Sequence, residues 1–305
     1  MNRAIGIDIG GTKISLGLVN HTGHILAQLK LPTNPDQGFD PAIQRISDAI
    51  GDLLQQTHTT LANVAGIGIG CPGPLNPFTG VILNDFTLPS WGGHNLIQAL
   101  HNRFGIPVHL ENDADAALLG EAFAGAGRGA SNLVMLTFGT GVGGAALSQG
   151  TVYRGAHGEH PEIGHLPIDP TGPACYCGLN GCLESIASGT GIGNLGKAAG
   201  FTDAQDVFTS ALANNDLARS IVDRAIAAAT TALWTLIHTF LPERVILGGG
   251  IMERHYSLFE PSLQRVISQA TLRPSTGMQL CQAQLQNDAG LVGAAFLALR
   301  ETLRK

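Results

Sequence analysis

Apolar and polar residues alternate with a period of two in the N-terminal part of the chain. Apolar side chains occupy every second position over 5–9, 14–18 and 25–31, and these runs are separated by Gly10-Gly11-Thr12 and by the turn around Thr22-Gly23. Such alternation is typical of strands with one buried face, and short turns join antiparallel neighbours. The pattern therefore predicts an antiparallel meander.

Beyond this meander the apolar spacing switches between that of helices and that of strands. It predicts a helix over 41–57, a strand over 64–69, a helix over 97–104 and a strand over 108–110. An antiparallel meander followed by alternating helices and strands is typical of an α/β fold.

The order strand, Gly-rich turn, strand then occurs a second time. Residues 133–138 predict a strand, 139–144 form a Gly-rich turn, and 145–147 predict the next strand. We interpret this repetition as an internal structural duplication. Farther on, the pattern indicates an irregular insertion over 153–188, a helix over 216–240, a strand over 244–247, the turn 248–250 and a helix over 289–300.

Length and composition set the scale of the fold. The chain has 305 residues, more than one domain usually needs, and 44% hydrophobic with 13% charged residues excludes disordered, collagen-like and coiled-coil proteins. We expect two domains with a cleft between them. The small α/β domain covers 1–115 and is joined by a C-terminal helix over 290–305, and the large α/β domain covers 116–305.

Charge and hydropathy exclude several partners. The net charge is −6 and no block of Lys or Arg occurs, which argues against a nucleic-acid partner. Asp8 falls where a secretory signal needs apolar residues. The apolar run 225–241 contains His238 and lies between charged residues, as in a buried core helix. We expect a cytoplasmic protein with no membrane partner.

Glycine-rich turns are the first candidates for a ligand site. In the first turn, Asp8 is followed by Gly10, Gly11, Thr12 and Lys13. Glycines let backbone N–H groups approach a phosphate, Thr12 and Lys13 add a hydroxyl and a cation, and Asp8 can hold water around Mg²⁺. A plain hairpin turn is the alternative explanation. Since a strand follows, the turn is neither a Walker loop nor a dinucleotide-binding loop.

Two further Gly-rich turns favour the phosphate interpretation. The second lies at the equivalent place in the duplicated half, so two turns can close on one polyphosphate. The third follows an apolar strand and can admit the flat face of an adenosine, although an ordinary strand-to-helix turn explains it equally well. Together the motifs resemble the phosphate and adenosine motifs of the actin, sugar-kinase and chaperone ATPase superfamily. The residues concerned are Gly139, Thr140, Gly141 and Gly143 in the second turn and Gly248, Gly249 and Gly250 in the third.

Three of the five cysteines cluster in one stretch. His165, Cys175, Cys177 and Cys182 offer one imidazole and three thiolates, a tetrahedral set that suits Zn²⁺ and leaves no open position. In a chain without a recognisable signal segment, such a cluster favours a metal over disulfides. We predict a structural zinc that holds the insertion in shape.

The same region carries the most specific resemblance. Glu-x-Gly-His over 162–165, followed by Cys-x-Cys-Gly-x-x-Gly-Cys-x-Glu over 175–184, resembles the ROK family of repressors, open reading frames and sugar kinases. With Asp8–Lys13, Glu111–Asp113 and the turn 139–144 in the same order, the resemblance covers essentially the whole chain. It implies a two-domain actin-like ATPase (ribonuclease H-like) fold with an interdomain cleft and a zinc-stapled insertion at 162–184.

The resemblance also implies roles for individual residues. Asp113 matches the catalytic base of the family, and His165 matches a residue that serves both the zinc and the sugar. The chemistry agrees, because carboxylates satisfy the donors of a polyol and a carboxylate beside the attacking hydroxyl takes its proton. Alone, Asp113 can also be explained as a helix cap. The residues that match sugar ligands are Asn112, Asp113, Glu162, His165 and Glu184.

The resemblance implies an ATP-dependent hexose kinase that transfers the γ-phosphoryl of Mg-ATP to a sugar hydroxyl, with O6 of glucose as first candidate. The sugar stays open, because 160–165 resembles fructokinases, whereas 175–178 resembles glucokinases and the N-acetylmannosamine and N-acetylglucosamine kinases. A sugar-responsive repressor is disfavoured, since an N-terminal helix-turn-helix does not fit into the seven residues before Asp8. Dimers are common in the family, so we expect a homodimer.

Overall fold

The computed structural model describes residues 2–270 and 277–303, and the side chains only as far as residue 300. These residues form two compact units. Unit 1 comprises 2–129, 152–161 and 284–303, and unit 2 comprises 130–151 with the described residues of 162–283. The division falls after residue 129 and not after 115, because helix α3 (Asp113–Ala124) packs against α9 (Ala289–Leu303). Of the helix expected over 290–305, residues 304 and 305 lie outside the described residues.

The sheet of unit 1 has the strand order β3-β2-β1-β4-β7. Its first three strands form the predicted antiparallel meander, and β4 and β7 are added in parallel. The parallel strands therefore end at one edge of the sheet. The strands are β1 (Arg3–Ile9), β2 (Lys13–Asn20), β3 (Ile25–Pro32), β4 (Ile67–Cys71) and β7 (Val108–Asn112).

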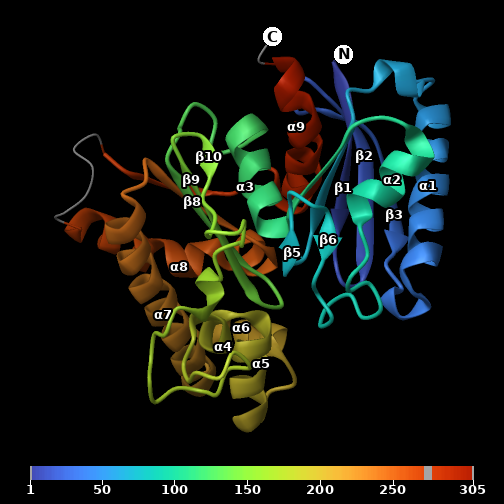
Figure 1. Ribbon diagram of the computed structural model, residues 1–305. Coiled ribbons are helices and arrows are strands. Elements are labelled where there is room, and N and C mark those ends of the chain that lie inside the picture. Colours follow the sequence, from blue (N-terminus) through green and yellow to red (C-terminus); the bar gives the residue numbers. More distant parts are fainter. Residues whose placement is uncertain (1, 271–276, 304–305) are drawn as a thin grey trace. The chain divides into compact units, whose positions relative to one another are not determined.

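Helices cover both faces of this sheet. Ile5 and Ile7 of β1 pack with α1 (Phe39–Gln56) and α2 (Leu96–Phe104), whereas Ala4 packs with α9 on the opposite face. Figure 1 shows α9 on one side of the sheet and α1 on the other. Successive strand residues point to opposite faces, so β1 is apolar on both and lies between two cores.

Unit 2 repeats this topology. Its sheet has the order β10-β9-β8-β11-β12, and β8 pairs antiparallel with β9 and parallel with β11, as β1 does with β2 and β4. The predicted duplication is thus confirmed at the level of sheet topology. The strands are β8 (Leu133–Phe138), β9 (Val142–Ser148), β10 (Thr151–Val152), β11 (Arg244–Gly248) and β12 (Gln279–Gln282).

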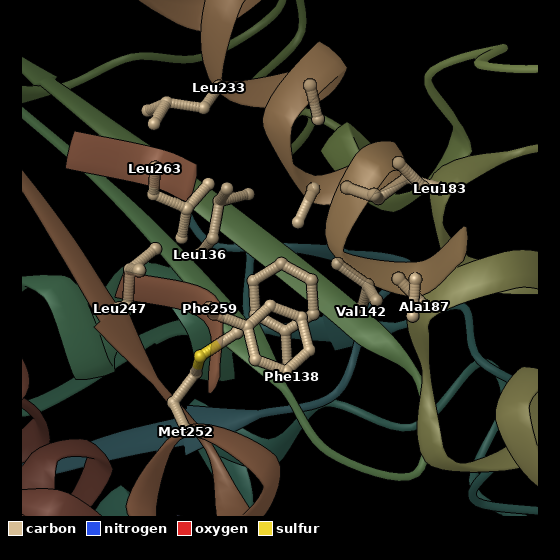
Figure 2. Close-up of a cluster of buried hydrophobic side chains, with 14 of the residues drawn as sticks. Leu136, Phe138, Val142, Leu183, Ala187, Leu233, Leu247, Met252, Phe259 and Leu263 are labelled. Atoms are coloured by element: carbon tan, nitrogen blue, oxygen red, sulfur yellow. The ribbon is translucent and has the colours of Figure 1, made fainter. Parts of the chain in front are cut away.

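The helices of unit 2 were only partly predicted. The core gathers around Phe138, which packs against Phe259 at 6.3 Å between ring centroids (Figure 2). The sequence analysis did not predict helix α8 (Gly250–Gln269). This helix contains Pro261 and is kinked at His255, whose backbone is not helical. The other helical elements of unit 2 are η3 (Ile163–His165), α4 (Leu183–Ala187), α5 (Gly189–Ala198), α6 (Ala204–Leu212) and α7 (Asp216–Phe240). The short elements of unit 1 are η1 (Pro35–Gln37), η2 (Leu61–Asn63), β5 (Leu75–Asn76), β6 (Val81–Ile82) and η4 (Gln286–Asp288).

Helix α7 contains the apolar run noted in the sequence. Among the described residues it is the one helix whose length and mean hydropathy of 1.2 would suit a membrane span, and half of that stretch is buried. Ala225, Ala229 and Leu233 of α7 belong to the core of unit 2. The helix packs in that core as the sequence predicted.

Glycines allow α9 to approach β4 and α3 at backbone distance. A Cβ atom at Gly68 of β4 would lie 1.7 Å from the carbonyl oxygen of Ala294, and one at Gly293 would lie 1.7 Å from that of Ala116. Residues with a side chain are excluded at both positions. The same approach brings Gly290 of α9 against the carboxylate of Asp8, since a Cβ there would lie 2.8 Å from Asp8 Cγ.

We predict that Gly293→Ala destabilises the protein by about 3 kcal/mol, because its Cβ must push α9 away from α3. Gly51→Ala on α1 is a matched control, since this helical glycine has open space around it. The control should raise stability by about 0.5–1 kcal/mol. Urea denaturation of both variants measures the difference, and a neutral Gly293→Ala would contradict the packing argument.

Candidate functional site

Unit 1 brings Asp8 and Asp113 together at the carboxyl edge of its parallel strands. Asp8 pairs in register with Gly70 of β4, and Gly70 pairs with Glu111 of β7. A Cβ atom at Gly70 would lie 3.8 Å from Asp8 Oδ1 and 3.7 Å from Asp113 Cα. The residue between the two aspartates therefore has no side chain to separate them.

Burial and mutual repulsion change the acidity of these carboxyl groups. Burial raises the pKa of Asp8 to about 7, repulsion from Asp113 and Asp288 adds to the effect, and Lys13 opposes it. Burial also raises the pKa of Asp113, against the lowering effects of a backbone N–H and of His160. Clustered carboxylates are hard oxygen ligands, so this edge suits a cation such as Mg²⁺. Asp288 was not singled out by the sequence, since it belongs to no motif.

Asn112 and not Asp113 caps helix α3. Asn112 Oδ1 accepts hydrogen bonds from the backbone N–H groups of Ala114 at 2.9 Å and Asp115 at 3.3 Å. Asp113 Oδ1 accepts one bond, from Ala114 at 2.9 Å, and its side chain is partly buried. The alternative explanation of Asp113 as the helix cap is weakened, because its neighbour holds that position.

A buried ion network beside Asp113 was missed in the sequence. Arg154 Nη1 donates to Glu111 Oε1 at 2.6 Å, and its second nitrogen contacts the other carboxylate oxygen of Glu111. His160 Nδ1 lies 3.0 Å from Oδ2 of the fully buried Asp115. Because 43 residues separate Arg154 from Glu111, no local motif could have revealed the pairing.

The first Gly-rich turn joins β1 to β2. Gly10 N–H donates to Lys13 O at 2.9 Å, and Thr33 binds the carbonyl oxygens of Gly10 and Thr12. A Cβ atom at Gly11 would lie 2.9 Å from Thr87 Cγ2, so a residue with a side chain at this position would have to displace the side chain of Thr87. Contacts to the turn's carbonyls and to Gly11 thus fix its shape.

The second Gly-rich turn joins β8 to β9 and lies beside the start of α5. The N–H groups of Gly189 and Thr190 donate to the carbonyls of Gly139 and Thr140 at 2.8 and 3.1 Å. Apart from chain neighbours, no atom of the described residues lies within 4 Å of the place where a Cβ of Gly139 would be. Gly139 therefore leaves space for a ligand. That this turn and the first one close on one polyphosphate stays a prediction.

A cavity of about 600 Å³ opens beside the second turn, wholly within unit 2. In its wall His255 stacks on Phe208, with ring centroids 4.0 Å apart, and burial lowers the pKa of His255. The volume lies in the range of small-molecule and cofactor sites. Residues from two predicted motifs and from the unpredicted α8 meet in this wall, including Gly139, Thr140, Gly250, Phe208, Arg254 and His255.

The three glycines of the third Gly-rich turn do not all have the same role. A Cβ atom at Gly249, where φ is +85°, would lie 2.5 Å from Phe138 O, and one at Gly248 would lie 3.0 Å from Met135 Cε. Packing against the backbone of Phe138 and the positive φ therefore explain Gly249, whereas the contact at Gly248 is with the flexible end of Met135 and does not by itself require glycine. Of the three glycines, Gly250 lines the cavity.

The cysteine cluster assembles as the sequence spacing suggested. The ligand atoms of His165, Cys175, Cys177 and Cys182 all lie within 4.8 Å of one another. Cys175 Sγ is 3.4 Å from His165 Nδ1, and Cys177 Sγ is 3.5 Å from Cys182 Sγ. Two thiolates bound to tetrahedral zinc are separated by roughly 3.8 Å. The cluster therefore fits a metal ion of this kind.

Glu162, His165 and Glu184 lie in the same unit as this cluster. Glu162 is exposed at the start of η3, and Glu184 lies in the first turn of α4. Val142 N–H donates to Glu184 Oε2 at 2.8 Å, and a Cβ atom at Gly141 would lie 2.4 Å from this oxygen. Gly141, expected at a phosphate, therefore also makes room for a carboxylate. Gly143 pairs with Thr137 in the β8–β9 ladder.

Comparison with known proteins matches almost the whole chain. The family model described as the ROK family matches residues 4–301. The glucokinase of Thermotoga maritima is 35% identical over 311 residues, which cover 97% of this chain and 96% of that protein. The N-acetylmannosamine kinase of Escherichia coli O1:K1 / APEC is 33% identical over 305 residues, covering 98% and 99%.

Solved structures show the same architecture. A ROK hexokinase from Thermus thermophilus gives a TM-score of 0.86 at 32% identity, covering 99% of this chain and 100% of that one. A ROK family glucokinase from Streptomyces griseus, in complex with glucose and AMPPNP, gives 0.79 at 30% identity, covering 98% and 99%. The expected α/β fold of the actin-like ATPases is thereby confirmed.

We predict that Asp8→Asn stabilises the ligand-free protein at pH 8. There the carboxyl group is ionised in the folded state, where its pKa is about 7, and in the unfolded state, so only the folded state bears the cost of burying the charge. The gain should be about 1–3 kcal/mol, shrink as the pH falls below about 7, and vanish below about 4, where both states are protonated.

Calorimetric melting in the presence of EDTA at several pH values measures this effect. Asp52→Asn on α1 is the matched control, because that carboxylate is exposed and its replacement should change stability little. A loss of stability in Asp8→Asn at pH 8 would show that Asp8 is a net stabilising group.

Proposed function

The chain belongs to the ROK family, and on this premise we propose that it is an ATP-dependent sugar kinase that transfers the γ-phosphoryl group of ATP to a hexose hydroxyl. The placement of Asp113 carries the proposal, because it lies beside Asp8 at the carboxyl ends of the parallel strands β1, β4 and β7 and does not serve as the helix cap. Glucose, phosphorylated at O6, is the first candidate, in line with the glucokinases among its relatives. N-acetylmannosamine, N-acetylglucosamine and fructose are the alternatives.

Asp113 is the proposed catalytic base. Its carboxylate orients the attacking hydroxyl and takes the proton as the bond to phosphorus forms. Burial raises its pKa, which brings the carboxylate closer to the acidity that suits a base near neutral pH. The side-chain oxygen of Asn112 accepts a hydrogen bond from the first turn of α3. Its amide nitrogen is therefore the group proposed to donate to the sugar.

Glu162, His165 and Glu184 are the proposed sugar ligands of unit 2. Val142 N–H fixes one oxygen of Glu184, so the carboxylate meets a hydroxyl in a set orientation. His165 Nδ1 faces Sγ of Cys175, which directs Nε2 away from the cluster and toward a ligand. Carboxylates accept from sugar hydroxyls and the imidazole N–H donates to them.

Phosphate binding is assigned to residues 10–13 of unit 1 and to residues 139–141 of unit 2. The cavity beside Gly250 is assigned to the adenosine, because its volume and its aromatic wall suit a nucleotide base. When bound, Mg²⁺ neutralises charge on the phosphates, and Asp8 is the residue proposed to hold its water ligands. We further propose that the protein is a homodimer and is located in the cytoplasm.

A coupled ATPase assay with glucose, mannose, fructose, N-acetylglucosamine and N-acetylmannosamine tests the function. We predict ADP release that depends on sugar, with the highest kcat/KM for glucose. In Asp113→Asn the base is lost, so kcat should fall by about 10²–10⁴-fold while sugar affinity changes little.

Calorimetric titration of the sugar into both proteins separates binding from turnover. Asp52→Asn is again the matched control, with activity unchanged. An absence of sugar-dependent turnover with every sugar would contradict the kinase proposal. Substantial turnover in Asp113→Asn would remove only the assignment of the base.

The cluster of His165 with three cysteines is proposed to hold a structural Zn²⁺. The four donors fill a tetrahedral shell, so the ion would shape the loop without touching the reaction. We predict about one equivalent of zinc in the purified protein, lost in Cys182→Ser together with thermal stability. Cys281→Ser lies outside the cluster and should retain the metal. Less than about half an equivalent with intact thiols would argue against the site.

A further inference from the structure

In the sequence, Tyr176 stands between Cys175 and Cys177, two of the proposed zinc ligands. Its hydroxyl contacts His165, which is also a proposed sugar ligand. The residue is 81% exposed, yet its Oη lies 3.1 Å from His165 Nε2, and it lines the same cavity as Glu184. The phenol stands edge-on to the imidazole, with ring centroids 4.9 Å apart. The polar contact of the hydroxyl with His165, and not burial of the ring, therefore holds the side chain in place.

This polar contact has a defined direction. His165 Nδ1 faces Cys175 Sγ at 3.4 Å, and a nitrogen that binds a metal carries no proton, so a bound metal would place the proton on Nε2. Nε2–H then donates to Tyr176 Oη. A sugar hydroxyl would accept this same bond from the imidazole.

We propose that the Tyr176 hydroxyl stands in for one sugar hydroxyl in the ligand-free protein and that a bound sugar displaces it. The inference rests on the proposed function, since it takes Glu184 and His165 as sugar ligands. Backbone hydrogen bonds of Cys175 with Leu179 and Gly178 hold the loop on both sides of Tyr176, so the displacement is a rotation of the side chain. A cavity of about 570 Å³, lined by Tyr176, Cys175 and Glu184, lies next to the ring and gives it room.

This exchange makes Tyr176 a residue that sets the affinity for sugar. A sugar hydroxyl at this place replaces the bond that His165 loses when the tyrosine leaves. The bond from His165 to Tyr176 stabilises only the ligand-free protein, so it weakens the binding of every sugar by the same factor.

Tyr176→Phe tests the inference, because it removes the hydroxyl and keeps the ring. We expect the Kd for glucose, measured by calorimetry on the full-length zinc-loaded protein, to fall by about 2–10-fold, the equivalent of one hydrogen bond. Zinc content should not change, and kcat should stay within about twofold since the hydroxyl is absent from the sugar complex. Tyr153→Phe, an exposed tyrosine of unit 1, is the matched control and should leave the Kd unchanged.

Tyr176→Ala, which also removes the ring, should tighten glucose binding by a similar factor. An unchanged Kd in both variants would overturn the inference, because the hydroxyl would then not compete with sugar. A raised Kd would overturn it too and would make Tyr176 a direct sugar ligand. If the wild type phosphorylates glucose, either result leaves the kinase proposal intact. If neither wild type nor variant binds any sugar of the panel, the proposed function and this inference both fail.

Discussion

The approach of α9 to β1, β4 and α3 at backbone distance is the constraint on which unit 1 depends. A Cβ atom at Gly6 would lie 2.2 Å from the carbonyl oxygen of Leu291, and the gaps at Gly68 and Gly293 are narrower still. The same contact brings the start of α9 against Asp8, next to Asp113. Burial of these carboxylates and the raised pKa of Asp8 follow from that packing, so the free protein bears a cost that a bound cation would relieve.

In unit 2, glycines allow a similarly close backbone approach to strand β9. A Cβ atom at Gly164 would lie 2.1 Å from Val142 O, and one at Gly144 would lie 2.7 Å from Ile163 Cβ. The segment before the cysteine cluster therefore lies directly on the strand, and Val142 also holds Glu184. The segment that carries His165 and the carboxylate of Glu184 thus both contact Val142 of β9. We therefore expect a change in the cysteine loop to alter the position of Glu184 as well.

Prediction from sequence succeeded where the chemistry is local. The cysteine and histidine spacing identified a cluster that assembles, and the period-two runs identified the meander of β1 to β3. It did not find Arg154 or His160, whose acidic partners lie more than a helix away in the chain. Nor did it separate Asn112 from Asp113 at the start of α3, because adjacent polar residues are equally good caps until the backbone is known.

The sequence by itself determined the strands and helices with a clear period, the duplicated order of strands and Gly-rich turns, and the metal-ligand spacing. These are local properties, since side-chain direction repeats every two or roughly 3.6 residues and ligands a few residues apart share one loop. Only the tertiary structure decided which glycines serve packing and which leave space, that the charge of Asp288 acts on Asp8, and that the hydroxyl of Tyr176 contacts His165. Such contacts depend on how sheets and helices pack, and no short pattern encodes that packing.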